Sequence, residues 1–356
     1  MRVDLFDYDL PKELIAQYPL SRRDRSRLMV LNRSDRSIKH TFFYRIGEHL
    51  RPGDLLVIND TKVIPARLFG RKAGTGGRVE MLLLREIKPR IWEVLIKPVK
   101  KLYPGVIIEF GEGELKAKFL GRSSSGVFTA SLRYEGELRE ILDRIGKPPL
   151  PPYIKREPDD RDKERYQCVY AEKNGSVAAP TAGLHFTEEL LDRLQKMGVG
   201  ITRITLHVGL GTFQPVKTNV VEKHKMHSEF FHVPEEAARA ITETRSKGGR
   251  VIAVGTTSVR TLETVADERG NVAPASGYTD LFIYPGYRFK VVDGMVTNFH
   301  LPRSTLLMLV CAFAGRELVM KAYREAIERR YRFYSYGDAM LIITEPKRRS
   351  AKVELQ

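Results

Sequence analysis

Four segments of the sequence bring histidines, hydroxyl residues and glycines together outside the apolar runs expected to form the core. In the first, SVAAPTAGLHFT at residues 176–187, Pro180 and the small residues after it predict a tight turn, and His185 stands just before a helix that Thr187 would cap. Backbone N–H groups at such a turn and helix start can bind a carboxylate or a phosphate. The alternative is that His185 simply packs against the helix.

A second segment, ITLHVGLGTFQPV at residues 204–216, predicts a strand that delivers His207 and then two glycines, Gly209 and Gly211. A Gly-x-Gly after a strand is typical of dinucleotide-binding sites, but those need a helix immediately afterwards. Here Phe-Gln-Pro follows, and no helical pattern begins. The sequence therefore argues against a dinucleotide site and favours a glycine turn that lets a ligand approach the backbone closely.

In a third segment, VIAVGTTSVRTLE at residues 251–263, a strand and a glycine precede three hydroxyl residues at a predicted helix start, Thr256, Thr257 and Ser258. Arg260 lies in the first turn of that helix. One hydroxyl is expected to cap the helix, and capping needs only one of the three. We therefore predict an anion-binding or ribose-binding site, with capping alone as the alternative.

The fourth segment, TNFHLPRSTL at residues 297–306, places Asn298, His300 and Arg303 in a loop that Pro302 stiffens, ahead of an apolar helix. A histidine and an arginine in one rigid loop suit proton transfer or phosphate contact. A surface loop without a catalytic role is the alternative explanation.

The sequence argues against several other kinds of site. His224 and His227 form HKMH beside Glu229, but there is no HExxH and no set of cysteine partners, so we expect no metal. The two cysteines, Cys168 and Cys311, are far apart and lack CxxC spacing, which argues against a disulfide framework. No GxSxG, SxxK or Walker A sequence occurs, which argues against serine hydrolases and P-loop enzymes.

The charge balance indicates a polyanionic partner. Lys and Arg total 60 against 44 Asp and Glu, which gives a formal net charge of +16 and a pI near 9.7. Such an excess concentrates polyanions near the surface, although a basic surface without a partner is also common. Residues 1–10 lack the apolar region of a signal peptide, and the longest apolar run, residues 306–314, is too short to cross a bilayer. We expect a cytoplasmic protein with no membrane partner.

The elements that must position these segments fall into three stretches. The first opens with LPKELIAQYPL, a short helical pattern ended by Pro19, and later contains GDLLVINDT, which predicts a buried strand at residues 53–61. The middle stretch consists of short strand patterns separated by glycines, typical of a small β-barrel or sandwich. The third alternates helix and strand patterns, and its expected strands include LFIYPG at residues 281–286.

This order predicts an α/β protein of two domains. Residues 1–67 and 153–356 would form a discontinuous α/β domain with a mixed sheet, which carries the four chemical segments. Residues 68–152 would form a small β-barrel inserted into it, with PPLPPY marking the return to the first domain.

Eleven strings, taken in order from Asp7 to about Ile343, resemble those of one enzyme family. They are IAQYP, SRRDRSRL, GDLLVINDTKVIPARL, PPYIKR, RYQCVYA, GSVAAPTAGLHFT, HVGLGTFQPV, GTTSVRTLE, LFIYPGY, TNFHLPRSTLLMLV and YRFYSYGDAMLI. The chain is similar to S-adenosylmethionine:tRNA ribosyltransferase-isomerases, which act in queuosine biosynthesis. The family pattern usually has Thr where this chain has Cys168, an exchange of small side chains that gives no reason to treat the cysteine as a nucleophile.

The resemblance implies an unusual use of S-adenosylmethionine as a co-substrate, with no metal or other cofactor. Its ribosyl carbons would be transferred to the aminomethyl group of 7-aminomethyl-7-deazaguanine at the wobble position of a tRNA. Adenine and methionine would leave, and the added sugar would close to the epoxycyclopentanediol of epoxyqueuosine. The family also implies an α/β domain with an inserted β-barrel and tRNAs with GUN anticodons.

Matching this chemistry to the sequence gives two sets of candidate residues. The sulfonium acidifies the C5′ hydrogens, so a base is needed, and a second histidine could protonate the leaving adenine. The catalytic candidates are His185, His207, His300 and Asp60. We expect Arg260 with Thr256, Thr257 and Ser258 to bind the methionine carboxylate, and Asn59 or Asp60 to bind ribose hydroxyls. The other substrate-binding candidates are Thr181, Gly183, Gly209, Gly211 and Asn298.

For the RNA, we expect contacts from the barrel and from two basic segments. One is SRRDRSR with Arg22, Arg23 and Arg25, and the other contains Arg329, Arg330, Tyr331 and Tyr334. Interleaved basic and aromatic residues can neutralise phosphates and stack splayed bases, and the alternative is that the aromatic rings fill the core. No coiled coil or exposed apolar stripe requires a dimer, so we expect a monomer.

Two other functions fit part of this pattern. An S-adenosylmethionine-dependent RNA methyltransferase would share the substrates, but its usual glycine loop between strand and helix near the start of the domain is missing. A non-catalytic RNA-binding factor would use the barrel, but it leaves the loops around His185, His207 and His300 without a purpose.

Overall fold

The computed structural model describes residues 1–122, 127–209, 216 and 218–344. The chain folds into two compact units. The first contains Met1–Asn59, Pro180–Leu206 and Gln214–Gln356, and the second contains Asp60–Ala179 and His207–Phe213. The predicted combination of an α/β sheet with a β-barrel embedded in the chain is confirmed.

The first unit is built on a nine-stranded mixed sheet with the strand order β15-β13-β12-β3-β14-β16-β17-β1-β2. Strands β12, β3, β14 and β16 are parallel neighbours, whereas β13, β15, β17 and β2 each make an antiparallel pair. The bounds are β1 Arg27–Asn32, β2 Ile38–Phe42, β3 Leu55–Asn59, β12 Gly200–Leu206, β13 Glu229–Val233, β14 Val251–Val254, β15 Ala275–Thr279, β16 Gly294–Asn298 and β17 Ala339–Ile343.

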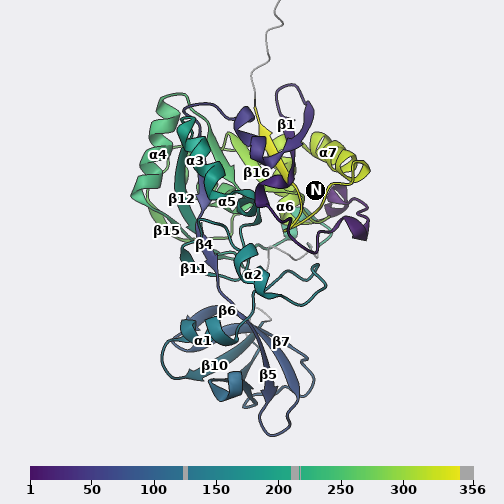
Figure 1. Cartoon of the computed structure of the whole chain (residues 1–356), viewed down its shortest axis with the longest axis vertical. Helices are drawn as coiled ribbons and strands as arrows, with labels where there is room; N and C mark the ends of the chain where they lie inside the picture. Colours follow the sequence, from purple (N-terminus) through teal and green to yellow (C-terminus); the bar gives the residue numbers. More distant parts are fainter. Residues whose placement is uncertain (123–126, 210–215, 217, 345–356) are drawn as a thin grey trace, which may run out of the picture. The chain divides into compact units, whose positions relative to one another are not determined.

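Apolar runs place the central strands inside the unit. Every residue of β3, β14, β16 and β17 is buried, as expected of strands covered on both faces. Helices α4 and α5 pack against β12, β3 and β14, and α6 packs against α5 and α7 (Figure 1). The helix bounds are α3 Glu188–Lys196, α4 Glu235–Ser246, α5 Thr256–Val265, α6 Thr305–Ala314 and α7 Arg316–Glu328.

The second unit contains a closed barrel of six antiparallel strands in the order β10-β7-β6-β5-β8-β9. Alternate residues point inward and form one apolar core, which includes Leu68, Met81 and Ile96. The bounds are β5 Arg67–Lys72, β6 Arg78–Lys88, β7 Ile91–Lys97, β8 Ile107–Phe110, β9 Leu115–Arg122 and β10 Phe128–Tyr134. The unit also contains helices α1 Leu138–Ile145 and α2 Asp160–Arg165, and a strand pair of β4 Thr61–Val63 with β11 Lys173–Ser176.

Short 3₁₀ turns complete the described structure. They are η1 Val3–Phe6, η2 Lys12–Leu14, η3 Arg23–Arg25, η4 Phe43–His49, η5 Gly111–Gly113, η6 Thr181–His185 and η8 Val221–Lys223. Within the described ranges, no helix is long and apolar enough to span a membrane.

Two expected elements are wrong. LPKELIAQYPL forms only the turn η2 and not a longer helix, because Ile15 and Ala16 continue as extended backbone that pairs with Phe333. Residues 281–286 form no strand, and the carbonyl of Leu281 accepts a hydrogen bond from the Arg260 side chain instead of from a neighbouring strand. The edge strand of the sheet is β15, which pairs with β13.

Candidate functional site

The parallel strands end at one edge of the sheet and bring three of the four chemical segments there. Strand β3 ends at Asn59, β12 at Leu206, β14 just before Gly255, and β16 at Asn298. Because β12, β3, β14 and β16 are parallel neighbours, their carboxyl ends lie along the same edge. This is the edge at which open α/β sheets usually bind ligands.

Asn59, the last residue of β3, forms hydrogen bonds with the end of β12 and the start of α5. Its side-chain amide donates to the Leu206 carbonyl at 3.0 Å and to the Thr257 hydroxyl at 3.3 Å, and its amide oxygen accepts from the Leu206 N–H at 3.0 Å. The residue is 1% exposed. Asn59 therefore positions the start of α5 against the end of β12, and the ribose contact stays a prediction.

Helix α5 begins directly at this edge. Its N-cap is Gly255, whose φ of 92° suits glycine, and no side chain caps the helix. The expectation that a hydroxyl would cap it is therefore wrong: Ser258 donates back to the Val254 carbonyl, and Thr257 accepts from Asn59. Among the described residues, no acceptor meets the N–H groups of Thr256, Thr257 and Ser258, so they are available to an anion.

Arg260 does not present its guanidinium to that anion site. Its Nη1 forms an ion pair with Glu229, Nε donates to the Leu281 carbonyl at 3.0 Å, and Nη2 donates to the Thr279 carbonyl at 3.3 Å. The residue is 4% exposed. The position of Arg260 thus contradicts the predicted carboxylate contact, because the side chain already joins α5 to β13 and to the segment after β15.

Both ring nitrogens of His185 have hydrogen-bond partners. Its Nδ1 is 2.7 Å from Ser26 Oγ, and the Ser26 hydroxyl itself donates to the Arg23 carbonyl. The Asn298 amide lies 3.1 Å from His185 Nε2 and also donates to the Tyr334 carbonyl. Since Nε2 receives a hydrogen bond and Ser26 already uses its own hydrogen, the proton of the neutral ring lies on Nδ1.

Several contacts keep His185 neutral and fixed. Burial, with smaller effects of the positive charges of Arg332 and Arg23, lowers the pKa of His185 to about 3. The ring stacks on Phe43 with centroids 5.0 Å apart. Thr181 donates to the amide oxygen of Asn298 at 3.0 Å, which fixes the amide orientation.

His300 is the second buried histidine of the first unit. Its Nε2 lies 2.7 Å from Thr297 Oγ1, and its backbone N–H donates to the Tyr323 hydroxyl at 2.9 Å. The Tyr8 hydroxyl donates to the His300 carbonyl. Burial lowers the pKa of His300 to about 3, so this ring is also neutral at physiological pH. Across the described ranges, Nδ1 has no hydrogen-bond partner.

Asp60, His207 and Gly209 belong to the second unit. His207 Nδ1 is 2.7 Å from the Thr61 hydroxyl, and burial lowers the pKa of His207. Gly175 has a φ of +143°, and a Cβ there would lie 2.6 Å from His207 Nε2. Asp60 is 4% exposed, and its carbonyl accepts from the N–H groups of Glu172 and Lys173. The predicted Gly211 lies outside the described residues.

The family model for queuosine biosynthesis proteins matches residues 3–342. The chain belongs to this family. It is similar to enzymes named S-adenosylmethionine:tRNA ribosyltransferase-isomerase from Caldanaerobacter subterraneus subsp. tengcongensis, at 59% identity, and Symbiobacterium thermophilum, at 60%. In each case the match covers 96% of this chain and 100% of the relative.

A solved structure supports this assignment. The chain is 45% identical to S-adenosylmethionine tRNA ribosyltransferase from Thermotoga maritima, with a TM-score of 0.55. The match covers 95% of this chain and 100% of that one. The chain is therefore an enzyme of the ribosyltransferase-isomerase family.

The basic residues predicted to contact RNA are mostly exposed, but the aromatic ones are not. Arg22 is exposed and pairs with Asp24, and Arg25 lies over the Tyr44 ring. Arg23 is partly buried, and its guanidinium donates to the Leu184 carbonyl.

At the second basic segment, Arg329 and Arg330 are exposed. Tyr331 is 1% exposed and Tyr334 is 6% exposed, so these rings lie in the core and do not present a face to a base. The core alternative is the correct one for both tyrosines.

The remaining predicted residues have local partners. Gly183 lies in the turn η6, where its N–H donates to the Pro180 carbonyl.

His224 and His227 belong to no metal-binding arrangement: no group of three or more His, Cys, Asp or Glu side chains in the part of the chain that the structure describes is placed to hold a metal ion.

Sequence reasoning missed the hydroxyl partners of the histidines. Ser26, Thr61 and Thr297 each lie 2.7 Å from a histidine ring nitrogen. Ser26 stands in a segment that attracts attention only by its charge, and it lies 159 positions from His185. Thr61 gives a clearer signal, because it directly follows Asn59 and Asp60 at a strand end.

Proposed function

We propose that this enzyme transfers and isomerises the ribosyl group of S-adenosylmethionine onto 7-aminomethyl-7-deazaguanine at the wobble position of tRNAs with GUN anticodons. The product is epoxyqueuosine, and adenine and methionine are released. The observation that carries the proposal is the set of neutral, hydrogen-bonded polar groups at the carboxyl edge of the sheet in a chain of this family.

The chemistry explains why neutral histidines suit this site. The reaction breaks the glycosidic bond to adenine, the C1′–O4′ bond of the ribose and the bond from C5′ to the sulfonium sulfur. In their place it forms the bond from the aminomethyl nitrogen to C1′, the C1′–C5′ bond that closes the carbon ring, and the O4′–C5′ bond of the epoxide, while one proton leaves C5′ and one leaves the amine. The sulfonium takes up the bonding electron pair as methionine leaves, and adenine needs a proton. A neutral imidazole can accept the acidified C5′ proton, whereas a protonated one cannot.

The two buried histidines of the first unit then differ in role. Both ring nitrogens of His185 are engaged by Ser26 and Asn298, so His185 serves to position Asn298 and the turn η6. His300 is neutral and uses one ring nitrogen for Thr297, which supports it as a proton acceptor. His207 and Asp60 are the corresponding candidates in the second unit.

The methionine carboxylate is assigned to the start of α5. The N–H groups of Thr256, Thr257 and Ser258 supply donors and the positive end of the helix dipole. Arg260 supports this site only indirectly, because Glu229 holds its guanidinium. Because the substrate is a tRNA, we place the enzyme in the cytoplasm, and we propose that it acts as a monomer.

Product analysis tests the function. The purified protein is incubated with S-adenosylmethionine and an anticodon stem-loop carrying 7-aminomethyl-7-deazaguanine, and the small molecules are separated by chromatography. Release of adenine and methionine that depends on the modified base supports the proposal. S-adenosylhomocysteine would identify a methyltransferase instead, and tight RNA binding without turnover would identify a non-catalytic factor.

Histidine variants then test the roles. His300→Gln and His207→Gln should each reduce kcat strongly, and the reduction should persist at saturating S-adenosylmethionine. His185→Gln should reduce stability as well as activity, because the ring holds Ser26 and Asn298 together. Full activity in all three variants would refute the assignment of a histidine base.

A further inference from the structure

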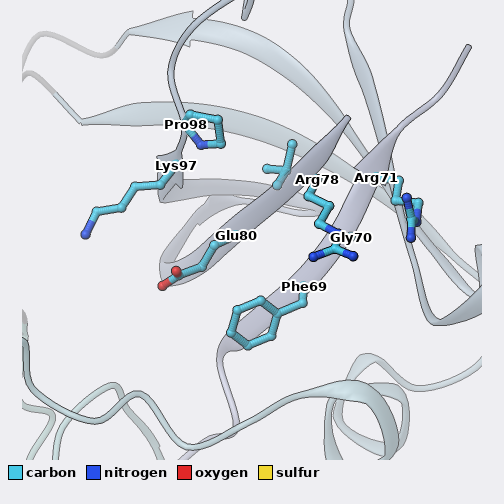
Figure 2. A pocket seen from close by; sticks show the side chains of 8 residues that line it. Phe69, Gly70, Arg71, Arg78, Glu80, Lys97 and Pro98 are labelled. Carbon is cyan, nitrogen blue, oxygen red and sulfur yellow. The ribbon is translucent and has the colours of Figure 1, made fainter. Parts of the chain in front are cut away.

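The outer face of the barrel carries a basic strip on strands β5, β6 and β7. Its outward residues follow from the register: Arg67, Phe69 and Arg71 alternate on β5, Arg78 and Glu80 on β6, and Lys97 on β7. Phe69, Arg71, Arg78, Glu80 and Lys97 line a surface hollow of about 480 Å³, and Figure 2 shows their side chains around it.

Two arginines of this strip lie directly opposite each other. Arg71 and Arg78 are cross-strand partners in the β5–β6 ladder, so both side chains stand on the same face. Like charges in this position repel and destabilise a sheet. Arg71 donates to the Gly76 carbonyl at 3.3 Å, and neither arginine forms an ion pair within the described ranges.

The neighbouring carboxylates are already engaged. Glu80 pairs with Arg67 at 2.9 Å. Glu109, which is opposite Arg71 on β8, pairs with Lys116 at 2.7 Å. Neither carboxylate therefore forms an ion pair with Arg71 or Arg78, although Glu109 lies opposite Arg71 on the ladder.

Two other cross-strand pairs of the barrel show how charged residues are paired elsewhere. Arg85 lies opposite Glu93 and pairs with it at 2.9 Å. Lys116 lies opposite Arg133, another like-charged pair, but Lys116 has Glu109 as its partner. Arg71 and Arg78 therefore form an opposed pair in which, among the described residues, neither cation has a carboxylate as its ion-pair partner.

Phe69 gives this strip an apolar centre. The ring is 40% exposed, and its centroid lies 5.1 Å from the Arg67 guanidinium and 5.5 Å from Lys147 Nζ. Lys97 adds a further exposed cation. The Phe69 ring thus has cations on several sides and Glu80 opposite it on β6. An exposed ring beside arginines fits nucleic acid, whose phosphates bind arginine forks and whose bases and sugars contact apolar groups.

We propose that this barrel strip, defined as Phe69, Arg71, Arg78 and Lys97, binds backbone phosphates of the tRNA substrate. The inference rests on the proposed function for the identity of the RNA and adds a contact surface on the second unit. Arginine is suited to this role because its planar fork binds phosphate oxygens in a bidentate manner. The net charge of +16 supports a polyanionic partner.

The test compares two variants of the full-length protein that each lose two charges. The first, Arg71→Gln/Arg78→Gln, removes the opposed pair. The control, Lys118→Gln/Arg133→Gln, removes two exposed charges from β9 and β10, which lie across the barrel from β5 and β6 in the strand order. Dissociation constants for the full-length tRNA are measured from 50 to 300 mM salt, together with KM and kcat.

Each lost phosphate contact should weaken binding about fivefold at 0.15 M salt, so the Arg71→Gln/Arg78→Gln variant should bind tRNA roughly 10- to 30-fold more weakly. The slope of log K against log salt should fall by about 1.4 to 1.8 in magnitude. KM for the tRNA should rise by a similar factor with kcat unchanged, and the control should stay within about twofold of wild type. The thermal midpoint of the first variant should equal or exceed that of wild type, because a repulsive pair has been removed.

Three results would overturn the proposal. Unchanged tRNA affinity and salt slope in the first variant would show that the strip meets another partner, such as an acidic protein, or none. Equal weakening in both variants would show that only bulk charge matters. A fall in kcat without a change in affinity would place the arginines outside RNA binding. If wild type binds tRNA but shows no turnover, the proposed function fails while the binding comparison still decides this inference.

Discussion

The ion pair between Arg260 and Glu229 gives the sharpest test of how the sheet edge is built. Both side chains are 5% exposed, and the arginine also donates to the carbonyls of Leu281 and Thr279. In Arg260→Met, the Glu229 carboxylate stays buried without its cation. Removing one partner of a buried pair typically costs about 3–5 kcal/mol in the free energy of unfolding.

This cost converts into a measurable thermal shift. For a chain of this size, each kcal/mol lowers the unfolding midpoint by roughly 2 °C, so we expect a decrease of about 6–10 °C. The double variant Arg260→Met/Glu229→Met removes both charges and should recover most of this loss, because apolar replacement of a whole buried pair is often neutral. Thermal unfolding followed by circular dichroism gives all three values.

An exposed pair supplies the matched control. Arg45 and Glu48 form an ion pair with side chains that are 50% and 53% exposed. Arg45→Met should therefore lower the unfolding midpoint by less than about 2 °C. The reasoning would be refuted if Arg260→Met kept the wild-type midpoint while raising KM for S-adenosylmethionine tenfold or more. That result would mean that Arg260 binds the substrate carboxylate, as first predicted from the sequence.

Three further predictions follow from the site geometry. Gly175→Ala should lower kcat/KM about 100-fold in a steady-state assay. The new Cβ would lie 2.6 Å from His207 Nε2 and displace the imidazole ring. A variant with wild-type kcat/KM would contradict this prediction. Asn298→Ala should lower the free energy of unfolding by about 1–3 kcal/mol in urea titrations, because His185 and Thr181 both lose their hydrogen bond to the Asn298 amide. The control Arg329→Ala, at the exposed surface, should have little effect. The buried histidines His185 and His300 should make the fold sensitive to acid. The pKa of each is about 3 in the folded state and near 6.5 in the unfolded state, so only the unfolded state gains protons between these values. The free energy of unfolding therefore falls as the pH drops below about 6.5. At pH 5 each contributes a loss of about 2 kcal/mol, and thermal midpoints of wild type and His300→Gln at pH 7 and pH 5 should show a smaller loss in the variant.

The fold was largely predictable because the spacing of apolar residues indicates the strands and helices, and glycines and prolines mark where these elements end. The runs LLVIN, VIAV and AMLII predict buried strands, and glycine-separated alternating segments predict the barrel. Thr187 and Ser304 cap helices α3 and α6 as their positions before helical patterns suggest. LFIYPG is as apolar as a strand, but pairing depends on which backbone lies at the sheet edge, and β15 occupies that place.

The candidate site was predictable as a set of segments but not as a set of roles. A histidine at a strand end signals chemistry, yet whether its nitrogens are engaged depends on residues far away in the sequence, such as Ser26 for His185. The same limit explains why the ion pair of Arg260 could not be predicted from the sequence. Its place in the first turn of a helix suggests an anion ligand, and only the folded structure brings Glu229 to its guanidinium. Tyr331 and Tyr334 fail for a related reason, because a run of basic and aromatic letters does not show which side chains turn inward.

The strand order explains why such distant segments can cooperate at all. In sequence, the ends of β3, β12, β14 and β16 are separated by elements of both units, but in the sheet the order β12-β3-β14-β16 makes them consecutive. Asn59 then joins β3 to β12 and to α5, while Asn298 joins β16 to His185 and Thr181. Two asparagines thus fix the strand ends through side-chain amides that carry no charge. A charged residue at either position would face a large desolvation penalty at 1% and 2% exposure, whereas an amide satisfies both donors and acceptors. The hydrogen bonds that join these strand ends therefore come from two uncharged side chains.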